Sequence, residues 1–213
     1  MREGNVKARL VKVTRHLPEW EAVHAAAAAV SAGGIIALPT DTTYGLAASI
    51  WCERAVERLR KMKARAEGKS FVVLAADTDW LRGLVARVTP PEKRLMDAYW
   101  PGALTIVFEA SRTVPDYLVG RDRTIAIRVP DDALAQSILR ACGAPLVAPS
   151  ANLKGREPAR SAAEVRRDFG DSVDLILDGG PVESSLPSTI VVARRRGFEI
   201  LREGSLVLKG VRS

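Results

Sequence analysis

The sequence is poor in the residues that build disulfide scaffolds, metal centres and histidine-based catalytic sites. Its 213 residues include two cysteines and two histidines. Cys52 and Cys142 lie far apart and lack the spacing of a zinc site, and they give little support to a structural disulfide. His16 and His24 belong to no motif, so we expect both on the surface. This pair excludes a serine–histidine–aspartate triad elsewhere in the chain, and no metal site is predicted.

Long apolar runs are also absent. The first residues lack the apolar core of a signal peptide, and no apolar run reaches the length of a membrane span. We therefore expect a cytoplasmic protein with no membrane association. The 32 lysines and arginines outnumber the 25 acidic residues and give a formal net charge of +7. This surplus suits a polyanionic partner such as a nucleotide or RNA, but a solvated, arginine-rich surface explains it equally well.

Helical and strand patterns alternate along the whole chain. Helices are expected over 18–32, 53–63, 131–142 and 161–169 and on both sides of Pro90–Pro91; strands are expected over 8–13, 35–38, 71–76, 103–108, 124–129, 145–149, 173–178, 188–193 and 198–203. Arg194–Arg196 is predicted to be a solvated hairpin turn, and the tail from Gly204 is expected to be loose. Without a linker or repeat, the pattern indicates a single α/β domain with a mixed sheet.

The segment PTDTTYGL at 39–46 is the most unusual part of the sequence. It is expected to be a loop directly after a buried strand, where α/β sheets place their ligands. Its hydroxyls and backbone donors suit a small polar substrate such as an amino acid. Residues of these types also dominate ordinary turns, and taken alone the segment is better explained as a turn.

A second cluster of polar residues follows the helix predicted over 53–63. If the helix ends near Lys63, an extended segment puts Lys63 and Arg65 on one face, where both can meet the same anion. A solvated basic helix end is the alternative interpretation. Gly68-Lys69-Ser70 does not complete a P-loop, because the leading glycine is replaced by Lys63 and the segment runs from helix to strand.

Other polar residues lie at the ends of predicted strands. Ser150 and Asn152 follow the strand 145–149 and suit either phosphate binding or a turn. Arg128 is expected at the rim of the sheet as a carboxylate or phosphate ligand. Ser188 begins one strand, and Arg202 lies near the end of the last. Hydroxyls and cations without an evident base, nucleophile or metal cluster favour positioning and charge neutralisation over covalent catalysis.

Taken together and in order, these segments resemble the YrdC/TsaC family of threonylcarbamoyl-AMP synthases over residues 17–204. The resemblance is carried by LPTDTTYGL, Lys63-x-Arg65, WPGALTIVF, TIAIRVPDD, PLVAPSANLKG, LILDGG and PSTIVV. It implies a single YrdC-like domain spanning 1–213, with an open, twisted mixed sheet and flanking helices around a large, positively charged cavity.

The resemblance also implies a reaction. Members of this family condense L-threonine, bicarbonate or CO2, and ATP into threonylcarbamoyl-AMP and pyrophosphate, with Mg²⁺ accompanying ATP. The activity is that of a nucleotidyltransferase, and a downstream complex passes the threonylcarbamoyl group to tRNA. Some members were first noticed as double-stranded RNA binders, so direct binding of RNA or tRNA is a further expectation.

Site roles are implied position by position. Lys63, Arg65, Ser150 and Asn152 match the catalytic set; Arg65, Lys69, Thr124, Ser150, Asn152 and Arg202 match ATP contacts; Thr42, Arg128, Ser188 and the backbone of Ala148 match threonine contacts. The chain departs from the family pattern at 66–71, and Leu74 stands where some members carry a threonine-contacting histidine.

Two alternatives compete with the synthase. One is a catalytically inactive YrdC-like domain that binds double-stranded RNA or tRNA, and the presence of Lys63, Arg65, Ser150 and Asn152 speaks against it. The other is a carbamoyl-transfer domain of hydrogenase maturation, whose accompanying zinc-finger-like cysteines and acylphosphatase segment the sequence lacks.

Overall fold

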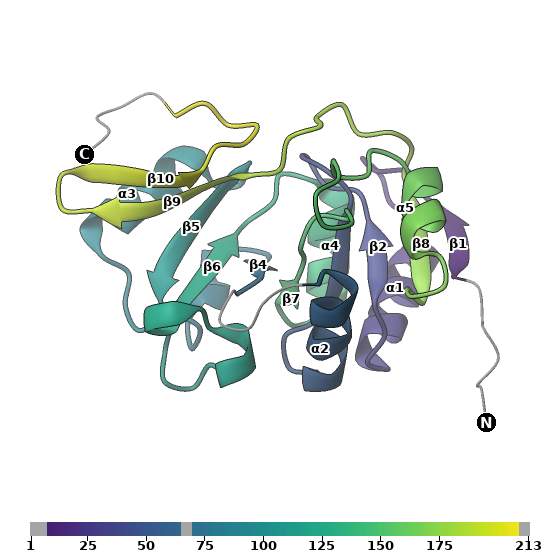
Figure 1. Cartoon of the computed structure of the whole chain (residues 1–213), viewed down its shortest axis with the longest axis horizontal. Coiled ribbons are helices and arrows are strands. Elements are labelled where there is room, and N and C mark those ends of the chain that lie inside the picture. Colours follow the sequence, from purple (N-terminus) through teal and green to yellow (C-terminus); the bar gives the residue numbers. More distant parts are fainter. Residues whose placement is uncertain (1–7, 65–69, 209–213) are drawn as a thin grey trace.

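The computed structural model describes residues 8–64 and 70–208, which form one mixed sheet flanked by helices (Figure 1). The strands are β1 (Arg9–Lys12), β2 (Ile36–Leu38), β3 (Gly45–Ser49), β4 (Val72–Leu74), β5 (Leu104–Glu109), β6 (Thr124–Arg128), β7 (Leu146–Val147), β8 (Leu175–Asp178), β9 (Thr189–Arg194) and β10 (Gly197–Arg202). The α-helices are α1 (Trp20–Ser31), α2 (Glu53–Met62), α3 (Pro90–Tyr99), α4 (Ala133–Cys142) and α5 (Ala162–Phe169). The predicted α/β class is confirmed.

The strands pair in the order β1-β8-β2-β3-β7-β4-β6-β5-β9-β10. The pairs β1–β8, β2–β8, β4–β6 and β5–β9 are parallel, and the other neighbours are antiparallel. The sheet is therefore mixed, as predicted. Strands β9 and β10 form the hairpin expected around the arginine run and lie at the opposite end of the sheet from β1 (Figure 1).

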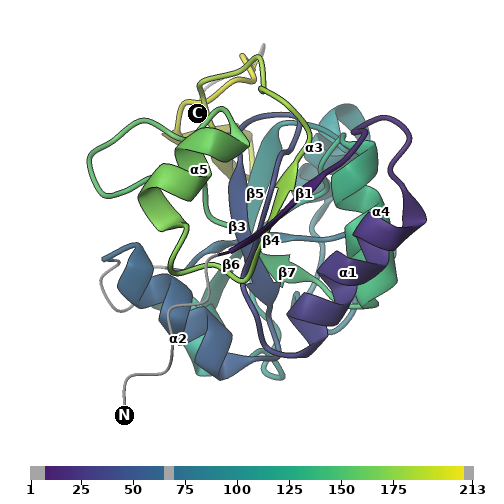
Figure 2. The same ribbon diagram turned by 90° about the vertical axis from the view of Figure 1, so that its right-hand side faces the viewer.

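The two faces of the sheet are covered differently. On one face α2, α3 and α5 bury Leu59, Leu95 and Phe169 in the larger core cluster. On the other face α1 and α4 lie side by side (Figure 2) and form a second cluster with β8, β2, β3 and β7. This second cluster ends at Leu74 in β4, and among the described residues no helix continues it over β6, β5 and β9. Half of this face is thus left uncovered.

Three parts of the fold differ from the sequence expectations. Strand β3 was expected to be partly loop and carries no β-branched residue, yet it forms because it pairs with β2 and β7 on its two sides. Before Pro90 the chain makes only a 3₁₀ turn, η1 (Thr78–Leu81), where an α-helix was expected. At α5 the spacing Ser161-x-x-Glu164 favours a capping box, but only half of it forms: Ser161 Oγ accepts from the Glu164 amide, whereas the Glu164 carboxylate accepts from the Arg160 amide.

The structure also shows the environment of the two histidines and the two cysteines and the character of the helices. His16 and His24 are exposed, as predicted. Cys52 and Cys142 are both free thiols. None of the described helices is long and apolar enough to span a membrane.

The tail from Gly204 is not loose over its described part. It turns back along the start of β9, where the Ser205 amide donates to the Pro187 carbonyl (2.9 Å) and the Gly204 amide donates to Thr189 Oγ1 (3.1 Å). Leu206 and Leu208 pack against the larger core cluster. A Cβ atom at Gly204 would lie 2.2 Å from the Pro187 carbonyl oxygen and 2.5 Å from the Thr189 nitrogen. Only glycine allows this close approach of two backbones.

Gly204→Ala should therefore lower the free energy of unfolding by about 1–3 kcal/mol, because the added methyl group forces two backbone segments apart. Gly45→Ala is the matched control, since the nearest atom to its added Cβ, the Pro149 carbonyl oxygen, is 3.6 Å away. Denaturant unfolding of both variants measures the difference. Equal stability of the two variants would show that the tail moves to accommodate the added methyl group without lowering the free energy of unfolding.

Candidate functional site

A cavity of about 740 Å³ occupies the uncovered half of the second sheet face. Side chains of β4, β6 and β9 that point to this face form its floor, and the ends of β2, β7 and α2 form its walls. All ten described residues that the sequence singled out line it: Thr42, Lys63, Leu74, Thr124, Arg128, Ala148, Ser150, Asn152, Ser188 and Arg202. Arg65 and Lys69 lie outside the described residues. Residues far apart in sequence thus meet in one place.

The position of the cavity follows from strand alternation. In β4 and β6, Val72, Leu74, Ala126 and Arg128 point to the cavity, whereas the alternate residues Val73, Ile125 and Ile127 belong to the larger core. Leu74 pairs with Arg128 across the parallel strands β4 and β6. Leu74 also belongs to the second core cluster, so it marks the boundary between the helix-covered half of this face and the cavity.

Arg128 lies at one end of the cavity and is almost entirely buried. It is the last residue of β6, as predicted, but with 4% exposure it does not project from the rim of the sheet. Its Nη1 donates to Thr42 Oγ1 and its Nε donates to the Gly102 carbonyl, both at 2.8 Å. Its Nη2 lies 2.5 Å from Asp41 Oδ1 as an ion pair, although the two atoms are not aligned as a hydrogen bond. The sequence missed Asp41 as the partner of this arginine.

The charge of Arg128 is balanced by two carboxylates. Burial lowers the pKa of Arg128, and the charges of Asp41 and Asp132 counteract this effect. Thr42 in turn is held by Thr40, whose Oγ1 lies 3.0 Å from Thr42 Oγ1 and donates to the Thr43 carbonyl at 2.8 Å. The threonine-rich loop is therefore a pre-arranged set of hydroxyls around a compensated cation rather than an ordinary turn.

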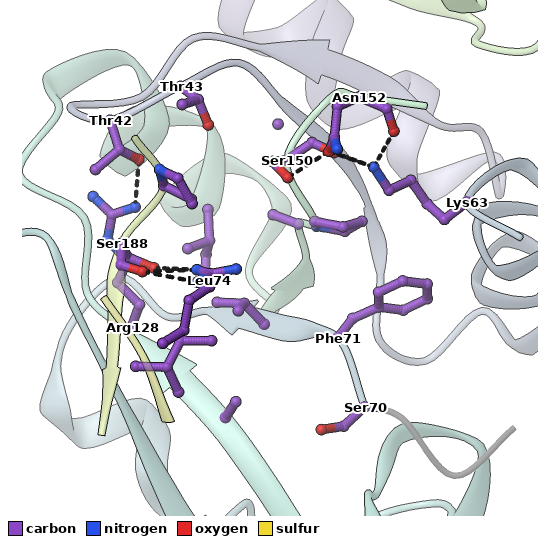
Figure 3. Close-up of a pocket in the computed structure, with 18 of the residues that line it drawn as sticks. Thr42, Thr43, Lys63, Ser70, Phe71, Leu74, Arg128, Ser150, Asn152 and Ser188 are labelled. Carbon is purple, nitrogen blue, oxygen red and sulfur yellow. Dashed lines mark hydrogen bonds between the residues drawn. The ribbon is translucent and has the colours of Figure 1, made fainter. Parts of the chain in front are cut away.

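Lys63 lies at the other end of the cavity with Ser150 and Asn152 (Figure 3). Its ammonium donates to the Ser150 carbonyl (2.8 Å), to Asn152 Oδ1 (2.7 Å) and to the Asn152 carbonyl. Ser150 Oγ also donates to Asn152 Oδ1 (2.7 Å). Lys63 thus fixes the loop after β7 as well as bringing a positive charge to this end.

The extended backbone that was expected to put Lys63 and Arg65 on one face does not begin at Lys63. Lys63 keeps a helical backbone conformation as the C-cap of α2, and Ala64 takes a positive φ of 43°. The chain therefore turns after the helix instead of running straight on. Lys63 reaches the cavity because α2 ends beside the loop after β7, and not because two cations alternate along an extended segment.

Ser188 and Arg202 meet along the floor between the two ends. Arg202 Nη2 donates to the Ser188 carbonyl at 2.7 Å and lies 3.3 Å from Ser188 Oγ. Ser188 Oγ also shares a hydrogen bond of 2.7 Å with Thr105 Oγ1, a buried residue of β5 that the sequence reading missed. Strand alternation alone could have found Thr105, because it lies two positions before Val107, which lines the cavity.

Tyr44 ties together the loops that surround the cavity. Its hydroxyl donates to the Gly180 carbonyl at 2.8 Å, and its backbone bonds to Ala159 and Ala151. Burial raises the pKa of Tyr44 to about 12, so the hydroxyl stays protonated and remains a donor near neutral pH.

An open mixed α/β sheet with a large cavity on one half of one face is an arrangement typical of small-molecule-binding domains. A family model described as telomere recombination, Sua5_yciO_yrdC, matches residues 28–204. The chain belongs to the Sua5/YciO/YrdC family, as its motif order indicated.

Relatives extend this similarity over most of the chain. A threonylcarbamoyl-AMP synthase from Pyrococcus abyssi is 31% identical over 202 residues, which cover 95% of this chain and 59% of the relative. This chain therefore spans less than two thirds of that relative. A threonylcarbamoyl-AMP synthase from Nitrosococcus oceani is 38% identical over 173 residues, which cover 81% of this chain and 93% of the relative.

Solved structures agree with the fold. P. abyssi Sua5 complexed with L-threonine matches with a TM-score of 0.87 and 30% identity, over 92% of this chain and 58% of that one. Escherichia coli YciO matches with a TM-score of 0.86 and 28% identity, over 93% of this chain and 96% of that one.

The ion pair of Arg128 and Asp41 can be tested by stability. Arg128→Gln should lower the free energy of unfolding by about 3–5 kcal/mol, because it leaves the buried Oδ1 atom of the partly exposed Asp41 carboxylate without its partner. Adding Asp41→Asn should recover most of this loss. Denaturant unfolding of the two single variants and the double variant measures the coupling. Losses that simply add would mean that the two residues do not act as a pair.

Proposed function

We propose that this chain is a threonylcarbamoyl-AMP synthase, which joins L-threonine, bicarbonate or CO2, and ATP into threonylcarbamoyl-AMP and releases pyrophosphate. The observation that carries this proposal is the division of one cavity into two chemically different ends. A buried guanidinium with threonine hydroxyls lies at one end, and Lys63 with the Ser150–Asn152 loop lies at the other. The relatives named as synthases, and the threonine complex of one related structure, support the same activity.

The Arg128 end suits an amino acid. Arg128 and the nearby hydroxyls of Thr42 and Ser188 offer cationic and neutral donors for a carboxylate and a hydroxyl group, and the Ala148 backbone lies at the same cavity wall. Leu74 gives the floor an apolar contact in place of a histidine. We therefore assign Thr42, Arg128, Ala148 and Ser188 to threonine.

The Lys63 end suits the phosphates of ATP. Lys63, Ser150 and Asn152 supply an ammonium, a hydroxyl and an amide at one wall, with Thr124 and Arg202 along the floor. These groups can neutralise and orient a triphosphate without forming a covalent intermediate. Arg65 and Lys69 are assigned to the same end from the sequence alone.

The proposed reaction has two bond-forming steps. The threonine amine first attacks bicarbonate, which forms the N-carboxylate and releases water. An oxygen of this carboxylate then bonds to the α-phosphorus of ATP, while the bond from that phosphorus to the bridging oxygen breaks and pyrophosphate leaves. Because both reactants are anionic, the chain's contribution is to hold them in line and to balance their charge.

Mg²⁺ fits this site only as a companion of ATP. The described residues contain no group of three or more His, Cys, Asp or Glu side chains that could hold a metal ion. The hydroxyl and amide oxygens near Lys63 are hard ligands that can complete a coordination shell made mostly of phosphate oxygens and water. When bound, Mg²⁺ would add positive charge at the leaving pyrophosphate.

The downstream steps extend this proposal beyond the cavity. An adenylate of this kind is an activated acyl group, and we propose that a separate transfer complex carries it to tRNA. The net charge of +7 supports a transient contact with tRNA or double-stranded RNA, which no described contact specifies.

Purified protein should release pyrophosphate from ATP only when threonine and bicarbonate are both present, because the nucleophile forms from the two together. Mass spectrometry of the same reaction should show threonylcarbamoyl-AMP. Pyrophosphate release without threonine would contradict the assignment. RNA binding in the absence of product would favour the inactive RNA-binding alternative.

The two ends of the cavity can be separated by calorimetric titration. The Asp41→Asn/Arg128→Gln double variant should bind threonine about ten- to a hundredfold more weakly than the wild type, because charge-assisted contacts to the carboxylate are lost. Its affinity for ATP should change much less. Loss of ATP binding with intact threonine binding would show that the two ends are assigned the wrong way round.

A further inference from the structure

Arg15 reaches the threonine-rich loop from a segment that the family model does not match. It lies between β1 and α1, before residue 28, where that match begins. Its side chain is 20% exposed and points inward, toward the start of α4 and the end of β2. No sequence motif marked Arg15 as a residue of the site.

The guanidinium of Arg15 joins the threonine-rich loop of the cavity wall to the start of α4. Nη2 donates to the Thr40 carbonyl at 2.8 Å and to Asp132 Oδ2 at 2.7 Å, and Nε lies 3.2 Å from the same oxygen. Asp132 is 4% exposed, and its other oxygen accepts from the Ala135 amide at the start of α4. The carboxylate is therefore fixed on both sides, and Arg15 fixes the loop to it.

Hydrogen bonds connect the position of the threonine-rich loop to the orientation of Arg128. Thr40 is held through its carbonyl by Arg15, and its hydroxyl holds the Thr42 hydroxyl. The Thr42 hydroxyl in turn accepts from Arg128. A shift of the Thr40 backbone would thus displace the hydroxyl that orients the buried guanidinium.

The same residues form an alternating set of charges. Arg15 Nη2 joins the Asp132 carboxylate (2.7 Å) to the Thr40 carbonyl (2.8 Å), and the charges of Asp41 and Asp132 both raise the pKa of Arg128 against the effect of burial. Arg15 neutralises Asp132 directly. Without Arg15, the uncompensated charge of Asp132 would repel an incoming carboxylate at the Arg128 end of the cavity.

The backbone makes room for this arrangement. The Arg15 stem passes over Gly179, where an added Cβ would lie 2.6 Å from Arg15 Cγ and 2.9 Å from Pro39 Cγ. Glycine at this position allows the stem to pack between β8 and the threonine-rich loop. The contact is part of the packing, unlike a surface ion pair.

We propose that Arg15 is a positioning residue for the amino-acid end of the cavity. It holds the Thr40–Thr42 hydroxyls in place and shields substrate from the charge of Asp132. This inference rests on the proposed function, since it takes the ligand at Arg128 to be the threonine carboxylate.

Arg15→Gln should raise KM for threonine by about tenfold, a loss typical of one displaced charge-assisted contact, with little change in KM for ATP or in kcat. Arg58→Gln is the matched control. Arg58 also bridges a carboxylate and a carbonyl, with Asp174 Oδ2 at 3.4 Å and the Ser172 carbonyl at 3.2 Å, but it lies away from the cavity. It should leave both KM values unchanged.

Adding Asp132→Asn to Arg15→Gln separates positioning from general stability. Asparagine keeps an oxygen for the Ala135 amide but removes the charge, so the double variant should regain part of the lost threonine affinity. Arg15→Lys keeps a positive charge near Asp132 but not the bridging fork. Its KM for threonine should therefore lie between those of the wild type and Arg15→Gln.

Equal rises in the two KM values, or a threonine KM no different from that of Arg58→Gln, would overturn the role of Arg15. If Arg15→Gln does not fold, Arg15→Lys carries the comparison, and an unchanged threonine KM overturns the role. Failure of the wild type itself to bind threonine or form product is a separate result, which would overturn the proposed function and this inference with it.

Discussion

A buried guanidinium constrains this structure more than any other single group. Arg128 lies beneath the surface of the cavity, where an ionised side chain is tolerated only with its charge and its donors satisfied. The Asp41 carboxylate and the Thr42 hydroxyl of the threonine-rich loop, together with the Gly102 carbonyl of a second loop, meet these needs. Each loop is therefore held in place by the requirements of one cation. The Arg128 end of the cavity is therefore arranged before any ligand binds, which is the condition for electrostatic positioning.

The need of the buried guanidinium for polar partners also explains why the cavity lies beside an apolar core. Helices α1 and α4 cover one half of a sheet face with alanine, valine and leucine, and this packing ends at Leu74. Arg128 is the partner of Leu74 in the next strand. An arginine at this point could not lie under a helix without losing its carboxylate partner. The end of the apolar cluster and the start of the polar cavity are thus two results of one change in residue type between adjacent strands.

The sequence predicted which residues would lie together in the cavity. It did not predict the hydrogen bonds and ion pairs that these residues would form. Thr42, Ser150 and Ser188 follow or begin strands, so their meeting at one sheet face could be expected from topology. The burial of Arg128 and its pairing with Asp41 depend on loops that periodicity does not place. Strand β3 was missed because its small residues show no strand preference until β2 and β7 pair with it. Arg15 and Asp132 are 117 positions apart, and no local pattern connects them.

Arg128 and Lys63, at opposite ends of the cavity, are held in ways that suit different tasks. The described partners of Arg128 include the charged carboxylate of Asp41, which holds the guanidinium in place. Arg128 can therefore offer only its remaining N–H groups to a ligand. Lys63 bonds to neutral carbonyl and amide oxygens of one loop. A phosphate oxygen is a stronger acceptor for an ammonium than these neutral groups, so an anion can replace one of them. Such an exchange would loosen the Ser150–Asn152 loop as ATP arrives. Binding at the Lys63 end is therefore expected to rearrange the wall, whereas binding at the Arg128 end fills a site that is already formed.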